Sequence, residues 1–323
     1  MAELHPESTT DDVLGDTDLS GRRVVVTGAS SGLGEETARA MASRGATVVM
    51  AARSADKNAA AVERIRAGAP DADVHPRELD LADLASVRRF ADGVSSDLDA
   101  VDVLVNNAGV MVCPFGHTAD GFEMQFGTNH LGHFLLTSLL ADAVLAGNEP
   151  RVVTLSSAAH LISDVDLDDP NFVSGDYDAW ISYGRSKSAN ALFALELARR
   201  LGDQGLRSYS VHPGMVATEL ARHMTEDLMA QMISRISERA EQAAASGEDA
   251  PTGSDMPAMR TPAVGAATQV WAAVAPELAD HTGAYLLDCH VGAGADVAPY
   301  VQDADRAAAL WSLSEDMVGQ SFG

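Results

Sequence analysis

The sequence predicts a doubly wound α/β fold, in which helices cover both faces of a parallel sheet. Short apolar segments of strand length alternate with amphipathic segments of helix length along most of the chain. The first apolar segment also runs into a glycine-rich turn and then directly into a helix. Strands separated by helices of this length form right-handed βαβ units, and such units build a parallel sheet.

Seven strands and five helices make up this expectation. Each expected strand is a short run of mainly apolar or β-branched side chains. The third is the weakest, because Pro76 cannot donate a hydrogen bond to a neighbouring strand. The expected strands are 22–27, 46–51, 74–79, 101–105, 151–155, 206–211 and 284–287. The expected helices run from the glycine-rich turn to about 44, from the second strand to about 67, onward from 83, from about 121 to 145 and from about 179 to 201.

Length and composition are those of an ordinary globular chain. Its 323 residues approach the upper limit for one hydrophobic core, and 46% are hydrophobic and 21% charged. No apolar run is long enough for a membrane helix, and the acidic start lacks the basic and apolar regions of a signal peptide. The two cysteines, Cys113 and Cys289, exclude a disulfide framework and a four-cysteine zinc site. We expect a cytoplasmic protein with an acidic N-terminal extension over 1–18 and a single domain over 19–323.

The net charge and the positions of the histidines argue against nucleic acid, anionic membranes and metal ions as ligands. The chain has 22 basic and 47 acidic residues, a net charge of −25. Such a surface repels nucleic acid and anionic membranes, so neither is expected as a partner. The ten histidines include no His-x-x-x-His pair accompanied by a glutamate, and we therefore expect no metal site.

The glycine-rich turn after the first strand reads Thr27-Gly28-Ala29-Ser30-Ser31-Gly32-Leu33-Gly34. Gly28 begins the turn, Gly32 removes a side chain where phosphates would pass, and Gly34 permits close packing of helix on strand. A pyrophosphate is stabilised at a helix N-terminus by free N–H groups and the helix dipole. Glycine-rich turns also join strands to helices for packing reasons alone, and the position after the first strand favours the dinucleotide.

A second pattern is Tyr183-Gly-Arg-Ser-Lys187 on an expected helix. Residues four apart share a helix face, so the phenol and the ammonium lie within reach of each other and of one ligand. A nearby cation favours the tyrosinate, and the pair can donate and accept a proton at a carbonyl or alcohol. The alternative is an ordinary surface pair. Tyr177 lacks a basic residue four positions later.

Five motifs in register resemble the short-chain dehydrogenases/reductases, from about Leu19 to Trp311. They are Thr27-Gly28-x-x-x-Gly32-x-Gly34, Asn106-Asn107-Ala108-Gly109, Ser156-Ser157, Tyr183-x-x-x-Lys187 and Pro213-Gly214. Three further stretches resemble the retinol-dehydrogenase-like branch, which includes WW-domain oxidoreductases. These stretches are 128–134, 156–160 and 187–190. The resemblance implies a Rossmann-like fold with a seven-stranded parallel sheet.

The resemblance also implies four catalytic residues. Tyr183 would be the acid/base, and Lys187 would lower its pKa and bind the nicotinamide ribose. Ser157 would polarise the substrate carbonyl; it is preferred to Ser156 because neighbouring strand residues face opposite sides. Asn129 would bend its helix around a water of the proton relay, or alternatively cap a neighbouring strand with its amide.

The cofactor-binding residues follow from the same resemblance. Asp80 would contact the adenine amino group, Asn106 and Gly109 would line the adenosine side, and the Pro213–Thr218 stretch would clamp the nicotinamide carboxamide. Turns at strand ends and a helix cap are the alternatives. The full expected set is Gly28, Ser30, Ser31, Gly32, Leu33, Gly34, Arg53, Asp80, Leu81, Asn107, Ala108, Gly109, Tyr183, Lys187, Pro213, Gly214, Val216 and Thr218.

The residues after the second strand favour NADP(H) over NAD(H). An NAD enzyme normally has a carboxylate there for the ribose 2′-hydroxyl. Ala52 stands in that place, and the following Arg53 offers a cationic fork suited to a 2′-phosphate. The alternative is an arginine that faces water at the start of a helix.

Together these features predict an NADP(H)-dependent oxidoreductase that transfers a hydride between the nicotinamide and a carbonyl or alcohol. One rival is a non-catalytic dinucleotide sensor or scaffold, which would not need the four catalytic residues. A dehydratase or epimerase on the same fold is a second rival, but nothing resembles the sugar-nucleotide domain that these usually attach. A homo-oligomer, a dimer or tetramer, is a further expectation from the resemblance.

An insertion over about 219–262 interrupts the alternation and predicts a substrate lid. Insertions of this length are usually lids or disordered segments. Leu228, Met229, Met232, Ile233 and Ile236 recur at helical spacing, and methionine adapts to irregular apolar ligands. We expect a mobile lid over 219–239 that covers a bulky hydrophobic carbonyl compound, followed by disorder over 241–254. The alternative is an interface with a second subunit.

Overall fold

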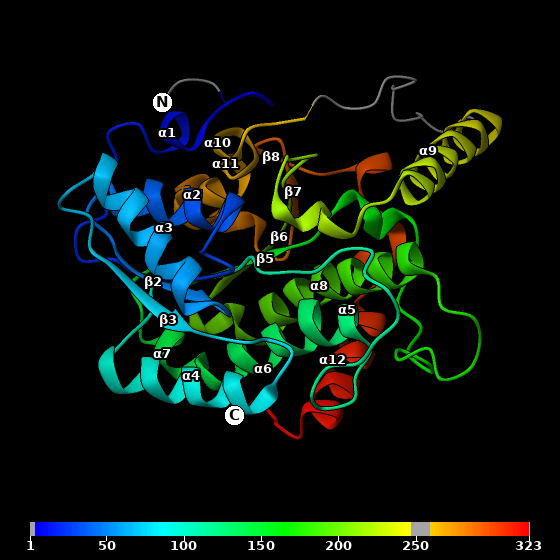
Figure 1. The fold of residues 1–323 in the computed structure, drawn as a ribbon, viewed down its shortest axis with the longest axis horizontal. Coiled ribbons are helices and arrows are strands. Elements are labelled where there is room, and N and C mark those ends of the chain that lie inside the picture. The colour runs from blue at the N-terminus through cyan, green and yellow to red at the C-terminus, as the bar shows by residue number, and fades with distance from the viewer. Residues whose placement is uncertain (1–3, 247–258, 323) are drawn as a thin grey trace.

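A computed structural model describes residues 4–246 and 259–322. Its centre is one eight-stranded sheet with the order β3-β2-β1-β4-β5-β6-β7-β8 (Figure 1). Strands β1 to β7 pair in parallel, and β8 pairs antiparallel to β7. The strands are β1 (Arg23–Thr27), β2 (Thr47–Ala52), β3 (Val74–Glu78), β4 (Val103–Asn106), β5 (Arg151–Leu155), β6 (Arg207–His212), β7 (Tyr285–Leu287) and β8 (His290–Val291).

The predicted α/β fold is confirmed, and β8 is an addition to its seven parallel strands. This strand has two residues, which is too short to give a periodic pattern in the sequence. It follows β7 through Asp288 and Cys289, whose φ angles are 49° and 55°. Two positive φ angles in succession are typical of the tight hairpin turns whose twist matches the flanking strands.

Helices cover both faces of the sheet (Figure 1). Val25 packs into the apolar core shared with α4, α6, α8 and α12, while Val24 and Val26 pack into the core shared with α1, α2, α3 and α11. Because both faces are buried, the central strands are apolar throughout rather than alternating. The helices are α1 (Thr10–Leu14), α2 (Gly32–Ala42), α3 (Ala55–Gly68), α4 (Leu84–Asp97), α5 (Met124–Phe126), α6 (Gly132–Leu139), α7 (Ala141–Leu145), α8 (Ala179–Leu201), α9 (Glu226–Ser246), α10 (Pro262–Gly265), α11 (Ala267–Val274) and α12 (Ala304–Val318).

The acidic N-terminal segment contributes to this packing. Thr9 caps α1 through a reciprocal pair of hydrogen bonds with Asp12. Val13 and Leu14 are buried in the core that α2 and α11 share. The segment before the first strand is therefore acidic on its outside and apolar on its inside.

The expected long helix over 121–145 contains a π-helical turn and one interruption. Between α5 and α6 the chain makes one π-helical turn, Gly127–Leu131, with Asn129 at its centre. A π-helical turn widens the helix locally, and such turns are frequent at functional sites. The predicted helix is therefore present, but it begins at Met124, contains a π-turn that leaves no distinct apolar spacing in the sequence, and is interrupted at Leu140.

The insertion after β6 begins with a 3₁₀ turn at Glu219–His223 and continues as α9, which projects from the body of the molecule (Figure 1). The backbone remains helical to Ser246, so the predicted disorder over 241–254 was wrong for its first six residues. The rest of that stretch lies outside the described residues. Among the helices that the structure describes, none combines the length and apolar character needed to cross a bilayer.

Candidate active site

The candidate residues meet at the carboxyl ends of the parallel strands, around the point between β1 and β4 where the strand order reverses. Ligands of doubly wound folds bind at this crevice. A Cβ on Gly28, after β1, would lie 2.8 Å from Ala108 Cα, after β4. A Cβ on Gly32 would lie 2.9 Å from Thr218 Cγ2, after β6. Three loops that are distant in the sequence therefore touch at one place.

The glycine-rich turn fits a dinucleotide pyrophosphate. Gly28 and Gly32 have φ angles of 67° and 57°, which side-chain-bearing residues rarely adopt. A Cβ on Gly34 would lie 2.4 Å from the Gly28 carbonyl oxygen, so the start of α2 lies directly against the turn. Ser31 precedes α2 without a side-chain capping bond to its first N–H groups. The site therefore presents a close backbone approach and a helix N-terminus, the two features that phosphates require.

The motif after β4 holds this turn in place. Asn107 Nδ2 donates to the Thr27 carbonyl oxygen at 2.7 Å, and Thr27 Oγ1 accepts from the backbone N–H groups of Asn107 and Ala108, both at 2.9 Å. Asn106, expected to line the adenosine side, does not do so. It is fully buried and donates to Thr137 Oγ1 at 3.0 Å, because its side chain points into the sheet packing instead of the crevice.

Tyr183, Lys187 and Ser157 come together beneath this crevice. Tyr183 and Lys187 lie on one face of α8 and are each 4% exposed. Lys187 Nζ lies 5.6 Å from the Tyr183 ring centroid and donates to the Leu155 carbonyl oxygen at 2.9 Å. The Ser157 hydroxyl, just past β5, lies close enough to the Tyr183 phenol to lower the pKa of that phenol. The neighbouring Ser156 instead donates to the Lys187 carbonyl oxygen at 2.8 Å, so of the two serines Ser157 faces the phenol.

Burial controls the pKa values of this pair. It raises the pKa of Tyr183 to about 12, although the hydrogen bond with Ser157 acts in the opposite direction. It lowers the pKa of Lys187 to about 7. The resemblance implied that Lys187 lowers the pKa of the phenol; in this structure burial sets the net direction, and the effect of Lys187 stays a prediction. A buried lysine with a pKa near 7 is only half charged at neutral pH, which weakens its effect on the phenol.

Asn129 joins the π-helical turn to the loop after β4. Its Oδ1 accepts from the Val110 N–H at 2.8 Å, and its Nδ2 donates to the Val110 carbonyl at 2.9 Å and to Ser186 Oγ at 3.0 Å. A Cβ on Gly109 would lie 3.2 Å from Asn129 Oδ1 and 3.8 Å from Lys187 Nζ. The absence of a side chain at Gly109 therefore leaves room for both the asparagine and the lysine beside it.

The remaining expected cofactor residues lie at the ends of neighbouring strands. Arg53 is exposed directly after β2, and Ala52 before it is buried. Asp80 follows β3, and its carboxylate accepts from the Ala82 N–H at 2.9 Å. Thr218 caps the 3₁₀ turn after β6, accepting from the Leu220 N–H at 3.3 Å. The other expected residues of these loops are Ser30, Leu33, Leu81, Pro213, Gly214 and Val216.

A cavity of about 580 Å³ lies next to the apolar cluster that contains Tyr183, although Tyr183 itself does not line it. Its walls come from the loop after β4, the start of α8 and the insertion, and include Val112, Phe115 and Leu228. Met224, Leu228 and Met232 pack against the buried cluster that contains Val112, Trp180 and Tyr183. Trp180 Nε1 also donates to the Leu228 carbonyl at 3.0 Å.

The inward face of α9 differs in part from the predicted one. Leu228 and Met232 belong to it, together with Met224, which precedes the helix. Ile233 points outward and is 45% exposed, and the side chain of Ile236 lies outside the described residues. The residues in contact are four apart, so only one narrow edge of α9 packs against the cluster around Tyr183. The apolar face predicted for this helix was broader.

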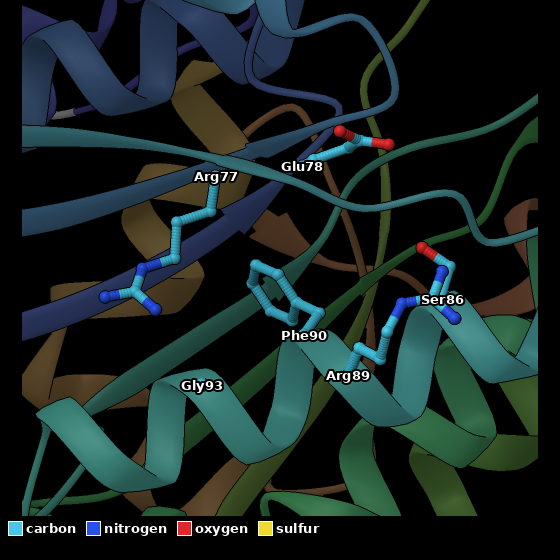
Figure 2. Close-up of a pocket in the computed structure, with 6 residues that line it drawn as sticks. All are labelled: Arg77, Glu78, Ser86, Arg89, Phe90 and Gly93. Atoms are coloured by element: carbon cyan, nitrogen blue, oxygen red, sulfur yellow. The ribbon is translucent and has the colours of Figure 1, made fainter.

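A second cavity, of about 350 Å³, lies between the edge strand β3 and α4 (Figure 2). Its lining includes Arg77, Arg89 and Phe90, and Arg77 is ion-paired with Asp97. In Figure 2 the side chains of Arg77 and Glu78 point in different directions, so they form no common binding group. None of its lining residues belongs to the cluster around Tyr183, and we do not assign the active site to it.

The sequence interpretation missed several residues that shape the site. Tyr177, which was set aside, lines the main cavity, and its hydroxyl donates to the Cys113 carbonyl at 3.0 Å. Gln125 is buried and connects Tyr177 to Val112. Its Nε2 donates to the Tyr177 hydroxyl at 2.9 Å, and its Oε1 accepts from the Val112 N–H at 2.8 Å. Val112 has a φ of 43°, a strained angle for a β-branched residue. No local pattern reports such contacts, because their partners are distant in the sequence.

These features define a nucleotide-dependent oxidoreductase, and comparison with known proteins gives its family. The sequence model of a family described as short chain dehydrogenase matches residues 22–229. The chain therefore belongs to the short-chain dehydrogenase/reductase family.

Within the family, the chain is similar to retinol dehydrogenases. It is 39% identical to human retinol dehydrogenase 13, over 93% of this chain and 86% of that protein. It is 40% identical to human retinol dehydrogenase 11, over 93% of this chain and 87% of that protein. A solved structure of a protein from Mycobacterium paratuberculosis is 38% identical, with a TM-score of 0.72 over 96% of this chain and 98% of the other. The predicted retinol-dehydrogenase-like branch is confirmed.

Proposed function

We propose that this protein is an NADP(H)-dependent reductase or dehydrogenase of apolar ketones, aldehydes and the matching alcohols. The observation that carries the proposal is the meeting of Tyr183, Ser157 and Lys187 between the glycine-rich crevice and the 580 Å³ cavity. A cofactor bound on one side and a substrate on the other would both reach the phenol.

The phenol and the serine would handle the oxygen of the substrate. With a pKa of about 12, Tyr183 carries its proton at neutral pH and can donate it to a carbonyl oxygen as negative charge develops there. Ser157 would donate a second hydrogen bond to the same oxygen. Lys187, with a pKa of about 7, can gain or lose a proton under the same conditions and so return one to the phenol. The nicotinamide, when bound, supplies or accepts the hydride.

The cofactor preference is argued from the end of β2. The buried Ala52 offers no carboxylate to a ribose 2′-hydroxyl, and the exposed Arg53 directly follows it. A guanidinium can bind a phosphate through two parallel hydrogen bonds. These residues favour a cofactor that carries a 2′-phosphate.

The substrate class is argued from the cavity walls. One part of the cavity wall is apolar, and charged or polar residues line much of the rest. The apolar residues include Val112, Phe115, Met224 and Leu228, and the others include Asp178, Arg222, His223 and Gln231. The volume suits a compound of more than about ten heavy atoms. The similarity to human retinol dehydrogenases 11 and 13 makes retinal and retinol the first candidates to test.

Cofactor oxidation by the purified protein tests the proposal. NADPH and NADH are each supplied with aromatic aldehydes, aliphatic ketones, a steroid ketone and retinal, and the reverse direction is run with the alcohols. We expect turnover with NADPH and the larger apolar carbonyls. No turnover with any pair would refute the reaction, and equal efficiency with NADH would refute the cofactor preference.

A further inference from the structure

We propose that Arg260 is a positioning residue for the nicotinamide end of the cofactor. It lies where the chain returns from the insertion, and its contacts fix residues 213–218, hereafter the clamp loop. The inference rests on the proposed function, because it takes the clamp loop to close over the nicotinamide.

The backbone of Arg260 extends the sheet alongside the clamp loop. Its N–H donates to the Met215 carbonyl at 2.8 Å, and Val216 and Arg260 form an isolated parallel β-bridge. The bridge fixes the middle of the clamp loop, at the point where the loop has left β6. A segment distant in the sequence therefore replaces the strand partner that the loop otherwise lacks.

The side chain of Arg260 packs against Gly214. A Cβ on Gly214 would lie 2.6 Å from Arg260 Nη1 and 3.0 Å from Cζ, so the guanidinium occupies the space that a side chain would take. Gly214 also has a φ of 78°, which independently favours glycine. The arginine thus contacts the loop at the residue where its backbone turns.

Asp288 holds the guanidinium in this place. Asp288 Oδ1 lies 2.5 Å from Arg260 Nη1, and the two side chains are only 24% and 16% exposed. Charge-assisted hydrogen bonds of this kind are stronger and more directional than neutral ones. Asp288 lies in the tight turn between β7 and β8 with a φ of 49°. This left-handed backbone conformation is less favourable for a residue with a side chain, and it occurs at the residue whose carboxylate binds Arg260.

The residues that follow Arg260 support the same loop from behind. Thr261 caps α10, and a Cβ on Gly265 would lie 2.4 Å from Val216 Cγ2 and 2.8 Å from Leu33 Cδ2. The chain at Gly265 therefore packs closely against both Val216 and Leu33. The return segment and the clamp loop form one packed unit.

The adenosine end of the crevice is separate from this unit. The residues expected there, Arg53 and Asp80, follow β2 and β3, which lie on the other side of β1 from β6 and β7. A change at Arg260 should therefore weaken binding of the nicotinamide half and leave the adenosine half unchanged.

Cofactor fragments separate these two halves experimentally. Dissociation constants are measured by titration calorimetry for NADPH and for 2′-phospho-ADP-ribose, which lacks the nicotinamide. The proteins are wild type, Arg260→Met, Arg260→Lys, Asp288→Asn and a matched control, Arg306→Met. The control removes an arginine of a similarly part-buried ion pair, 2.8 Å from Asp164, on α12. If wild type prefers NADH, the pair becomes NADH and ADP-ribose.

We expect Arg260→Met to weaken NADPH binding about tenfold, or about 1.4 kcal/mol, with fragment binding changed less than about twofold. Arg260→Lys and Asp288→Asn should also weaken NADPH binding more than fragment binding. These two variants replace Arg260→Met in the test if that variant does not fold. Arg306→Met should alter neither ligand. Equal weakening of both ligands, no change in either, or the same effect in the control would overturn the assignment. A wild-type protein that binds neither nucleotide would refute the proposed function itself.

Discussion

Lys187 should lower the stability of the protein at neutral pH, and replacing it should raise that stability. Burial lowers its pKa from 10.5 to about 7, so the unfolded chain binds more protons than the folded one between these values. Stability from this site is therefore fully present above pH 10.5 and is lost as the pH falls toward 7. The shift corresponds to a cost of about 4 kcal/mol at pH 7 and under about 1 kcal/mol at pH 10.

The variant Lys187→Met removes this cost and also one hydrogen bond, the bond to the Leu155 carbonyl oxygen. A buried hydrogen bond contributes about 1 kcal/mol. We therefore expect the variant to be about 3 kcal/mol more stable than wild type at pH 7, and no more stable at pH 10. Its turnover should be largely lost.

Urea unfolding without cofactor, followed by circular dichroism at several pH values from 7 to 10, measures this difference. Burial also raises the pKa values of the Cys113 and Cys289 thiols to about 11, but both proteins contain these groups and their effect cancels. A difference in the free energy of unfolding that does not change with pH would refute the reasoning, as would a variant less stable than wild type at pH 7.

Three further predictions concern the proposed chemistry. Tyr183→Phe should lower kcat at least about 100-fold and leave NADPH affinity unchanged, because only the proton donor is lost. Tyr209→Phe, which changes a buried phenol on β6, is the control. Retained turnover in Tyr183→Phe would contradict the assignment. Arg53→Ala should raise the KM for NADPH about tenfold and that for NADH little, since one phosphate contact disappears; equal changes would remove Arg53 from the cofactor site. Replacing Leu228 and Met232 with Ser should raise the KM for retinal but not the KM for small aldehydes. The control Ile233→Ser, at an outward-facing residue, should change neither KM. If the double variant dissociates an oligomer without a change in substrate preference, α9 is an interface and not a lid.

The sequence predicted the parts of the molecule whose signals are local. The strand 151–155 and the helix 179–201 occur with the predicted bounds, because an apolar run and a capped, regularly spaced helix are each visible in one stretch of chain. The glycine-rich turn was equally visible, since its spacing is itself the structural requirement.

The parts that could not be predicted depend on partners far away in the sequence. The exclusion of Asn106 from the crevice is decided by Thr137, 31 residues later. The opposite shifts of the pKa values of Tyr183 and Lys187 come from burial by several elements, which a motif does not report. Arg260 carries no pattern at all, and its importance depends on Gly214 and Asp288 lying beside it.

The edge strand β3 limits how copies of this protein can associate. Pro76 interrupts the row of N–H groups that an incoming strand would need, and the neighbouring His75 and Glu78 side chains are exposed and polar. A strand from another chain would gain few hydrogen bonds here and would bring polar groups together. Growth of the sheet from one molecule into the next is therefore disfavoured at this edge, and misassembly by strand addition is discouraged by a single proline.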